Sequence, residues 1–320
     1  MTRYARQIAV EGFGADAQNR LIQAKCLVIG AGGLAAPVLQ YLVGAGVGFI
    51  RLVDPDVVEL SNLHRQTLFR ESDIGAPKPH VATAHMKALN SDVEIEAHQT
   101  RFDPANSEAF CKDMDVIIDS ADSFAASYIA SDFCLQSGQP LVSASIVGRD
   151  GYVGGFCGGA PGLRAVFPDL PDRLGSCAAD GVLGTSVGVI GSLQAEMALS
   201  ILAGSKAPLG RLTTYDATEI RFGGFSFLGA KNPKAEPSFV ATSETNSKDQ
   251  IFDLRAESEA GPTLEGATRK TVLDFAEDTP DLDPNKRTIL ACTSGLRAWQ
   301  AADHLSKHWQ GEIKLIALGT

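Results

Sequence analysis

Short apolar runs alternate with longer stretches of helical periodicity along the first two thirds of the chain. We expect strands at residues 26–30, 49–53, 93–98, 115–119 and 140–144, with helices between them. Strands separated by helices favour a mostly parallel sheet that is covered by helices on both faces. The sequence therefore predicts an α/β fold with a Rossmann-like sheet.

The apolar stretch from Val182 to Ala203 could be a membrane-spanning helix or a buried helix. It contains several polar side chains, among them Gln194 and Glu196, and a glycine follows it at position 204. A spanning helix needs about 20 predominantly apolar residues, whereas a glycine directly after the last turn is typical of a helix C-terminus. We therefore expect a buried helix here and no contact with a membrane.

The composition changes after Leu228. Residues 229–248 are polar and rich in Ser, Thr, Pro and Lys, which is typical of a linker. Beyond them the pattern predicts strands at 250–255, 287–292 and 313–318 and a helix at 296–307. We expect a first domain over 1–228, a linker over 229–248 and a small α/β domain over 249–320.

A glycine-rich turn follows the first predicted strand. It reads Gly30-x-Gly32-x-x-Ala35, with a further glycine at position 33, and opens the next helix. Gly30 permits a tight turn, and Gly32 allows backbone amides to approach a phosphate at the helix N-terminus. Asp54 ends the second strand, where a carboxylate can hydrogen-bond a ribose hydroxyl. This pattern predicts a nucleotide site.

The residues after Asp54 indicate which nucleotide binds. Asn62, Arg65, Arg70 and Lys78 follow within one loop-rich stretch. Arginine and lysine are the usual counter-ions of phosphates, and a triphosphate carries more charge than the pyrophosphate of a dinucleotide. The cluster favours ATP over NAD, although any one of these side chains alone could be a solvated surface charge.

An ordered set of motifs resembles the ThiF/MoeB/HesA family, relatives of ubiquitin-activating enzymes. The motifs are Arg3-Tyr-x-Arg-Gln7, GAGGL at 30–34, D-x-D-x-V-x-x-S-N-L-x-R-Q at 54–66, Gly75-x-Pro-Lys78, Asp119-x-x-Asp122, the segment 188–194 and Tyr215-Asp-Ala217. The resemblance spans residues 2–228. It implies ATP-dependent adenylation of the C-terminal Gly-Gly carboxylate of a small ubiquitin-like sulfur-carrier protein from the molybdopterin or thiamine pathway, with release of pyrophosphate.

The resemblance also implies roles for individual residues. Arg65 and Lys78 would offset phosphate charge, Asp122 would hold Mg²⁺, and Arg6 would reach the γ-phosphate across a two-fold axis, which implies a homodimer. Asn62 would contact phosphate or orient Arg65. The nucleotide-binding set implied by the family is Gly30, Gly32, Gly33, Asp54, Asp56, Asn62, Arg65, Gln66, Lys78 and Asp122.

A second resemblance lies beyond the linker. Asp253-Leu-Arg255 and Cys292-Thr-Ser-Gly-Leu-Arg297 are similar to a rhodanese domain, here short and without its usual His-Ile-Pro-Gly-Ala stretch. Amides at a helix N-terminus lower a thiol pKa and stabilise a persulfide. The resemblance implies that a persulfide on Cys292 attacks the adenylate and leaves a thiocarboxylate, with a cysteine desulfurase as sulfur donor. The alternative is a buried structural cysteine.

Cysteine usage departs from the family. Many relatives hold zinc with two C-x-x-C pairs, but none of the six cysteines here forms such a pair, and segments 162–167 and 231–236 offer neither Cys nor His. Tetrahedral zinc usually takes four N or S ligands, so we predict no zinc site. Cys177 lies in a Ser/Asp/Gly-rich loop, where some relatives form a covalent link to the carrier; it is either such a nucleophile or an incidental thiol.

Charge and composition exclude some classes of function. A net charge of −10 and a pI near 5.1 argue against a nucleic-acid partner. The N-terminus lacks an apolar leader, and we expect a cytoplasmic protein. Three alternatives stay open: an NAD-dependent oxidoreductase, a degenerate adenylating fold that acts as a scaffold or regulator, and a relative that adenylates another acceptor.

Overall fold

The computed structural model describes residues 3–168, 181–233, 237–259, 261, 264–276 and 282–319. The first sheet has eight strands in the order β3-β2-β1-β4-β5-β6-β7-β8. Its strands are β1 (Lys25–Ile29), β2 (Phe49–Val53), β3 (Glu94–His98), β4 (Val116–Asp119), β5 (Pro140–Val147), β6 (Asp150–Cys157), β7 (Arg211–Asp216) and β8 (Arg221–Ser226). Strands β1 to β5 are parallel to one another, whereas β6, β7 and β8 are each antiparallel to the strand before them.

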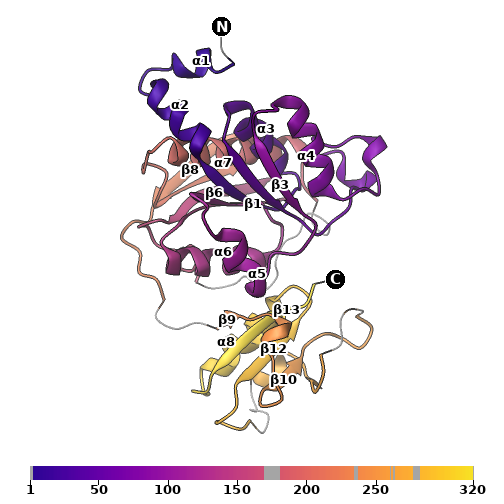
Figure 1. The fold of residues 1–320 in the computed structure, drawn as a ribbon. Coiled ribbons are helices and arrows are strands. Elements are labelled where there is room, and N and C mark those ends of the chain that lie inside the picture. Colours follow the sequence, from indigo (N-terminus) through magenta and orange to yellow (C-terminus); the bar gives the residue numbers. More distant parts are fainter. Residues whose placement is uncertain are drawn as a thin grey trace.

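Helices cover both faces of the parallel half (Figure 1). They are α2 (Gly14–Gln23), α3 (Ala35–Ala45), α4 (Lys78–Leu89), α5 (Pro104–Cys111), α6 (Phe124–Ser137) and α7 (Gly184–Leu202), whereas the short helix α1 (Ala5–Ile8) has no buried residue and lies against α2. Cys26 and Val28 of β1 pack into the core with α3 and α7, whereas Leu27 and Ile29 pack into the core with α6. A strand buried on both faces reads as a continuous apolar run, which is why the sequence reveals these strands clearly.

Helix α7 is long and apolar enough to cross a membrane by length and composition. In this structure it packs against α3 and against β5 and β6. Its Gln194 is completely buried and hydrogen-bonded to the sheet. The helix is therefore part of the core of the first domain, as the polar residues in its sequence indicate.

A second, five-stranded sheet follows, with the order β11-β10-β12-β13-β9 and all neighbouring strands parallel. Its elements are β9 (Ser238–Phe239), β10 (Gln250–Asp253), β11 (Thr268–Arg269), β12 (Thr288–Cys292), α8 (Leu296–Ser306) and β13 (Ile313–Ala317). Strand β9 comes from the stretch that the sequence pattern assigns to the linker. It pairs with β13 and so adds an edge strand to the second sheet.

The two sheets share one apolar core on the α6 side of the first domain (Figure 1). Trp299 of α8 lies against Phe124 and Tyr128 of α6, with ring centroids 5.5 and 5.0 Å apart. The guanidinium of Arg164 lies over the Trp299 ring at 4.4 Å and over the Tyr128 ring at 5.1 Å. Aromatic packing and a cation–π contact therefore hold the second sheet against α6.

Candidate functional site

The glycine turn between β1 and α3 forms the floor of the site. Gly30 has φ of +92°, and a Cβ there would lie 2.8 Å from the carbonyl oxygen of Ser120. A side chain at Gly33 would meet Val187 of α7 at 2.8 Å. By contrast, a Cβ at Gly32 would meet only Gln66, at 3.7 Å, so this part of the turn stays open to a ligand. The turn thus packs tightly where it meets protein and is open where the phosphates are expected.

Asp54 anchors the turn from the end of β2. Its two carboxylate oxygens accept hydrogen bonds from the amides of Ala31, at 2.7 Å, and Asp56, at 2.8 Å. Burial raises the pKa of Asp54, while these amides act in the opposite direction. Each carboxylate oxygen keeps acceptor capacity, so the side chain can still bind a ribose hydroxyl.

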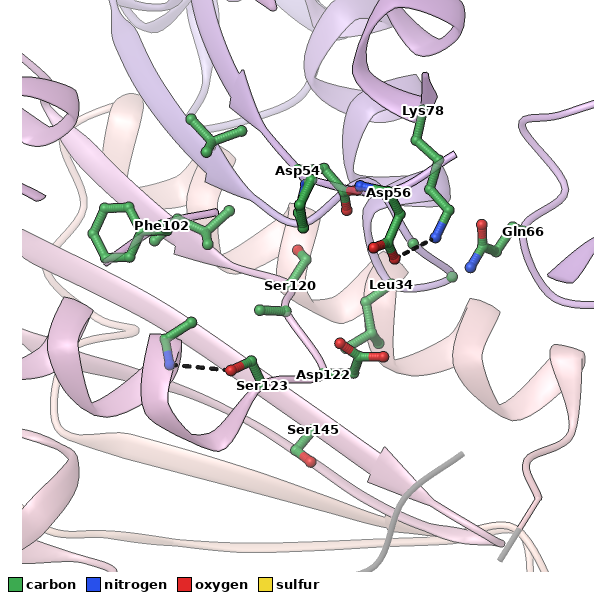
Figure 2. A pocket seen from close by; sticks show the side chains of 18 of the residues that line it. Leu34, Asp54, Asp56, Gln66, Lys78, Phe102, Ser120, Asp122, Ser123 and Ser145 are labelled. Atoms are coloured by element: carbon green, nitrogen blue, oxygen red, sulfur yellow. Dashed lines mark hydrogen bonds and ion pairs between the residues drawn. The ribbon is translucent and has the colours of Figure 1, made fainter. Parts of the chain in front are cut away.

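Asp56 and Lys78 form an ion pair at the edge of the site, with Nζ 2.9 Å from the carboxylate oxygen (Figure 2). The lysine side chain is only 6% exposed, whereas that of Asp56 is 60% exposed. Lys78 is the first residue of α4, and its amide also bonds to the Asp56 carbonyl oxygen at 2.9 Å. The structure thus holds an ammonium group inside the cavity beside one solvent-exposed counter-ion, which an incoming phosphate can replace.

A turn after β2 presents Arg65 and Gln66. The carbonyl oxygen of Asn62 accepts the amides of both residues, at 3.1 and 2.9 Å, while the Asn62 side chain bonds to Ser61. Gln66 is 4% exposed, and its Oε1 has no hydrogen-bond partner. The backbone of Asn62 therefore holds this turn, and Asn62 does not line the cavity. The two roles that the resemblance implies for Asn62 stay predictions.

The end of β4 closes the opposite side. Asp119 is completely buried and accepts hydrogen bonds from Ser143 Oγ at 2.7 Å and from the amide of Ala121 at 3.2 Å. Gln194 of α7 donates to the Asp119 carbonyl oxygen at 2.6 Å and accepts from Ser120 Oγ at 3.0 Å. This network fixes the loop that carries the exposed carboxylate of Asp122 into the cavity (Figure 2).

We expect Asp119→Asn to increase stability above pH 6. Burial raises the pKa of Asp119 to about 6, so the folded chain binds more protons than the unfolded chain between pH about 4 and 6. Wild-type stability therefore falls as pH rises through that range, by about 2–3 kcal/mol in total. Asparagine has the same shape and no charge. Denaturant unfolding across pH 4–8 should show a variant advantage that grows with pH; a constant difference would contradict the prediction.

These residues surround a cavity of about 370 Å³. Nine of the predicted residues line it: Gly30, Gly32, Gly33, Asp54, Asp56, Arg65, Gln66, Lys78 and Asp122. Arg6 lies exposed on α1 and does not line this cavity, and Cys177 lies outside the described residues. The sequence pattern did not single out Arg101, Phe102 and Ser145, which also line it; their only signal is a position just after, or near the end of, a strand.

Cys292 lies at the other predicted site, at the end of β12. Its Sγ is completely buried and accepts hydrogen bonds from the amides of Gly295, at 3.1 Å, and Ala298, at 3.4 Å. Gly295 has φ of +89°, and a Cβ there would collide with Phe239. The loop thus directs two backbone amides and the N-terminus of α8 at the sulfur.

Glu259 braces this loop. It accepts two hydrogen bonds from Arg297, each at 2.6 Å, and one from Thr293 Oγ1 at 3.0 Å. The Arg297 guanidinium lowers the pKa of Glu259 to about 2, and Glu259 in turn raises the pKa of Arg297. The pair therefore stays ionised at neutral pH and keeps a positive charge beside Cys292.

Segments 162–167 and 231–236, which lack Cys and His, come into contact through Gly162 and Asn232. The amide of Gly162 donates to Asn232 Oδ1 at 2.8 Å, and Arg164 bonds to Asp132 at 2.7 Å. Within the described residues, no three His, Cys, Asp or Glu side chains come together to hold a metal ion. The absence of a zinc site stays a prediction.

The ThiF family model matches residues 4–237. A sulfur carrier protein adenylyltransferase of Thermus thermophilus is 41% identical over 231 residues, which cover 69% of this chain and 85% of the relative. An adenylyltransferase and sulfurtransferase, MOCS3, of Culex quinquefasciatus is 36% identical over 257 residues, 79% of this chain and 58% of the relative.

Among solved structures, the chain resembles E. coli MccB crystallised with ATP. The TM-score is 0.64 at 22% sequence identity, and the match covers 73% of each chain. At this level of identity the likeness concerns the fold alone. It agrees with the α/β architecture described above.

Proposed function

The chain belongs to the ThiF family, and from that premise we propose that it adenylates the C-terminal carboxylate of a small, glycine-ended sulfur-carrier protein and releases pyrophosphate. It is an enzyme of the adenylyltransferase class. The observation that carries the proposal is that Asp54, Lys78 and Asp122 line one cavity at the glycine turn. Its charged lining and the family membership speak against the NAD-dependent alternative.

The roles follow from charge. Attack of a carboxylate on the α-phosphate brings two anions together, so the site must neutralise negative charge. Lys78 and Arg65 supply fixed positive charge, and Asp54 fits the ribose. Asp122 would hold Mg²⁺, since that ion is usually bound by one or two carboxylates plus substrate phosphates, and the bound ion would neutralise developing charge.

A second subunit would complete the site. Arg6 on the exposed helix α1 is proposed to reach the γ-phosphate of a partner chain in a homodimer. This assignment rests on the family resemblance of the Arg3–Gln7 motif. The exposure of Arg6 supports it, because the side chain is free to contact a partner.

The second domain is proposed to act as a small rhodanese-like sulfurtransferase. The buried sulfur of Cys292, the amides directed at it and the neighbouring Arg297 support this role. A cysteine desulfurase would load the sulfur, and the adenylated carrier would leave with a thiocarboxylate. The carrier belongs to molybdopterin or thiamine synthesis in this proposal.

ATP–pyrophosphate exchange tests the first step. The purified chain is assayed with Mg²⁺ and each candidate carrier, and each carrier is then weighed by intact mass spectrometry. We expect exchange and an added AMP with one carrier, and neither with the same carrier lacking its terminal glycine. ATP binding without exchange for any carrier would favour another acceptor or the scaffold alternative.

A further inference from the structure

A second cavity, of about 250 Å³, lies between the two domains. Arg101, Asp122 and Ser123 line it on one side, directly after strands β3 and β4. Thr293, Ser294 and Ala317 line it on the other side, at the ends of β12 and β13. The carboxyl ends of parallel strands from the two sheets therefore face each other across this cavity, and such ends are where α/β proteins place their ligands.

This cavity and the nucleotide cavity have a common wall. Five residues line both of them: Arg101, Phe102, Asp122, Ser123 and Ala126. A group held at Asp122 in the first cavity therefore lies at the border of the second. The opposite border is formed by the two residues that directly follow Cys292.

A hydrogen bond from the Arg101 side chain and one strand pairing bring Cys292 close to this wall. Arg101 Nη1 donates to the carbonyl oxygen of Ala317 at 3.0 Å, and Ala317 is the register partner of Cys292 on the neighbouring strand. Since adjacent strands lie about 4.8 Å apart, Cys292 is on the order of 10 Å from the Arg101 guanidinium. An extended peptide spans that length with about three residues.

The docking of the second domain is fixed next to this loop. Helix α8 begins directly after the Cys292 loop, and Trp299 lies near its start. Trp299 packs on Arg164 and Tyr128 of the first domain. Arg164 also pairs with Asp132. None of Arg164, Asp132 and Trp299 lines either cavity. The clamp positions the Cys292 loop without taking part in binding.

We propose that the cavity between the domains receives the glycine-ended tail of the carrier, and that the acyl group moves through it to Cys292 of the same chain. The inference rests on the proposed function. Cys292 is completely buried, so the surface of a folded protein cannot contact its sulfur. A glycine tail has no side chains and is therefore the narrowest peptide that could approach it. Arg101 is a positioning residue in this scheme, because it joins the nucleotide cavity to the strand beside Cys292.

Sulfur transfer to the acyl group along this path needs a sulfane-sulfur donor and an added thiol. The Cys292 thiolate attacks the outer sulfur of thiosulfate; a new S–S bond forms, the old one breaks and sulfite leaves with the electron pair. The terminal persulfide sulfur then attacks the acyl carbon, and AMP leaves with the electrons of its C–O bond. An added thiolate attacks Cys292 Sγ, so the thiocarboxylate leaves and Cys292 ends in a mixed disulfide.

Complementation between two inactive chains tests the path. Lys78→Ala chains keep Cys292 but should not adenylate, and Cys292→Ala chains adenylate but cannot transfer sulfur. The two are co-expressed with different tags, doubly tagged protein is purified, and carrier is supplied with ATP, Mg²⁺, thiosulfate and a thiol. Linked groups meet at an effective concentration of about millimolar, so the doubly tagged protein at micromolar concentration should form thiocarboxylate roughly a thousandfold more slowly than wild type.

Recovery of about half the wild-type rate would overturn the inference, since it would mean transfer between chains. Pyrophosphate exchange in the same mixtures separates the two proposals. Exchange with recovered transfer refutes only the path within one chain, whereas loss of exchange in the wild type refutes the proposed function.

Arg164→Ala provides a second readout. We expect unchanged exchange and about tenfold slower thiocarboxylate formation, because the clamp on Trp299 is lost and the effective concentration of Cys292 falls. Arg164→Lys, which keeps the charge, should restore part of the rate. Arg20→Ala removes an exposed arginine from α2 and serves as the matched control. An unchanged transfer rate in folded Arg164→Ala protein would contradict the inference.

Discussion

Lys78→Ala is expected to slow ATP–pyrophosphate exchange by about two to three orders of magnitude, the range observed when one preorganised electrostatic contact is removed from an active site. The lysine side chain is 6% exposed and lines the nucleotide cavity, and its present partner, Asp56, is 60% exposed. Loss of the ammonium leaves a solvated carboxylate behind, so the fold should stay intact while phosphate binding weakens.

The matched control is Lys87→Ala on the same helix. Lys87 is an exposed residue in the last turn of α4 and does not line the cavity. We expect it to keep the wild-type exchange rate and the wild-type midpoint of thermal unfolding. Normal turnover in folded Lys78→Ala protein would refute the role given to this lysine.

Cys292→Ser is expected to abolish thiocarboxylate formation while exchange continues at the wild-type rate. Serine has no sulfur and therefore cannot carry a persulfide. Exchange should continue because Cys292 does not line the nucleotide cavity or the cavity between the domains. Intact mass of the carrier detects the product, because sulfur replaces one oxygen of the terminal carboxylate. Adenylated carrier should then accumulate without conversion.

Cys111→Ala serves as the control for this substitution. Cys111 ends α5 and is also completely buried, but no amide is directed at its sulfur in the hydrogen bonds of the described residues. Burial raises the pKa of this thiol to about 12, so it is inert at neutral pH. Thiocarboxylate yield that persists in Cys292→Ser protein would assign sulfur transfer to another residue.

The parallel half of the first sheet could be predicted from sequence chiefly because its inner strands β1 and β4 are buried on both faces. The expected strands at 26–30 and 49–53 correspond to β1 and β2, and the apolar stretch 182–203 corresponds to α7. The glycine turn could also be recognised in the sequence, because the tight contacts at Gly30 and Gly33 exclude side chains and so require glycine. Local constraints of this kind leave a signal in a single sequence.

The antiparallel strands and the domain contact left no such signal. Strands β6 and β8 each contain two adjacent glycines, and every residue of β8 is exposed, so no apolar run marks them. The two-residue strand β9 depends on pairing with β13. Arg101 and Arg164 contact residues far away in the chain, such as Ala317 and Trp299. Local sequence patterns carry no information on such pairs.

The apolar core that the two sheets share has a consequence for how the chain loses its structure. Phe124 and Trp299 are each other's packing partners, so melting either domain exposes the aromatic surface of the other. Domains joined by such an interface tend to unfold together in one cooperative transition. Heat or a destabilising substitution in either half should therefore silence both chemical steps at once, and adenylated carrier should not accumulate in a partly denatured enzyme.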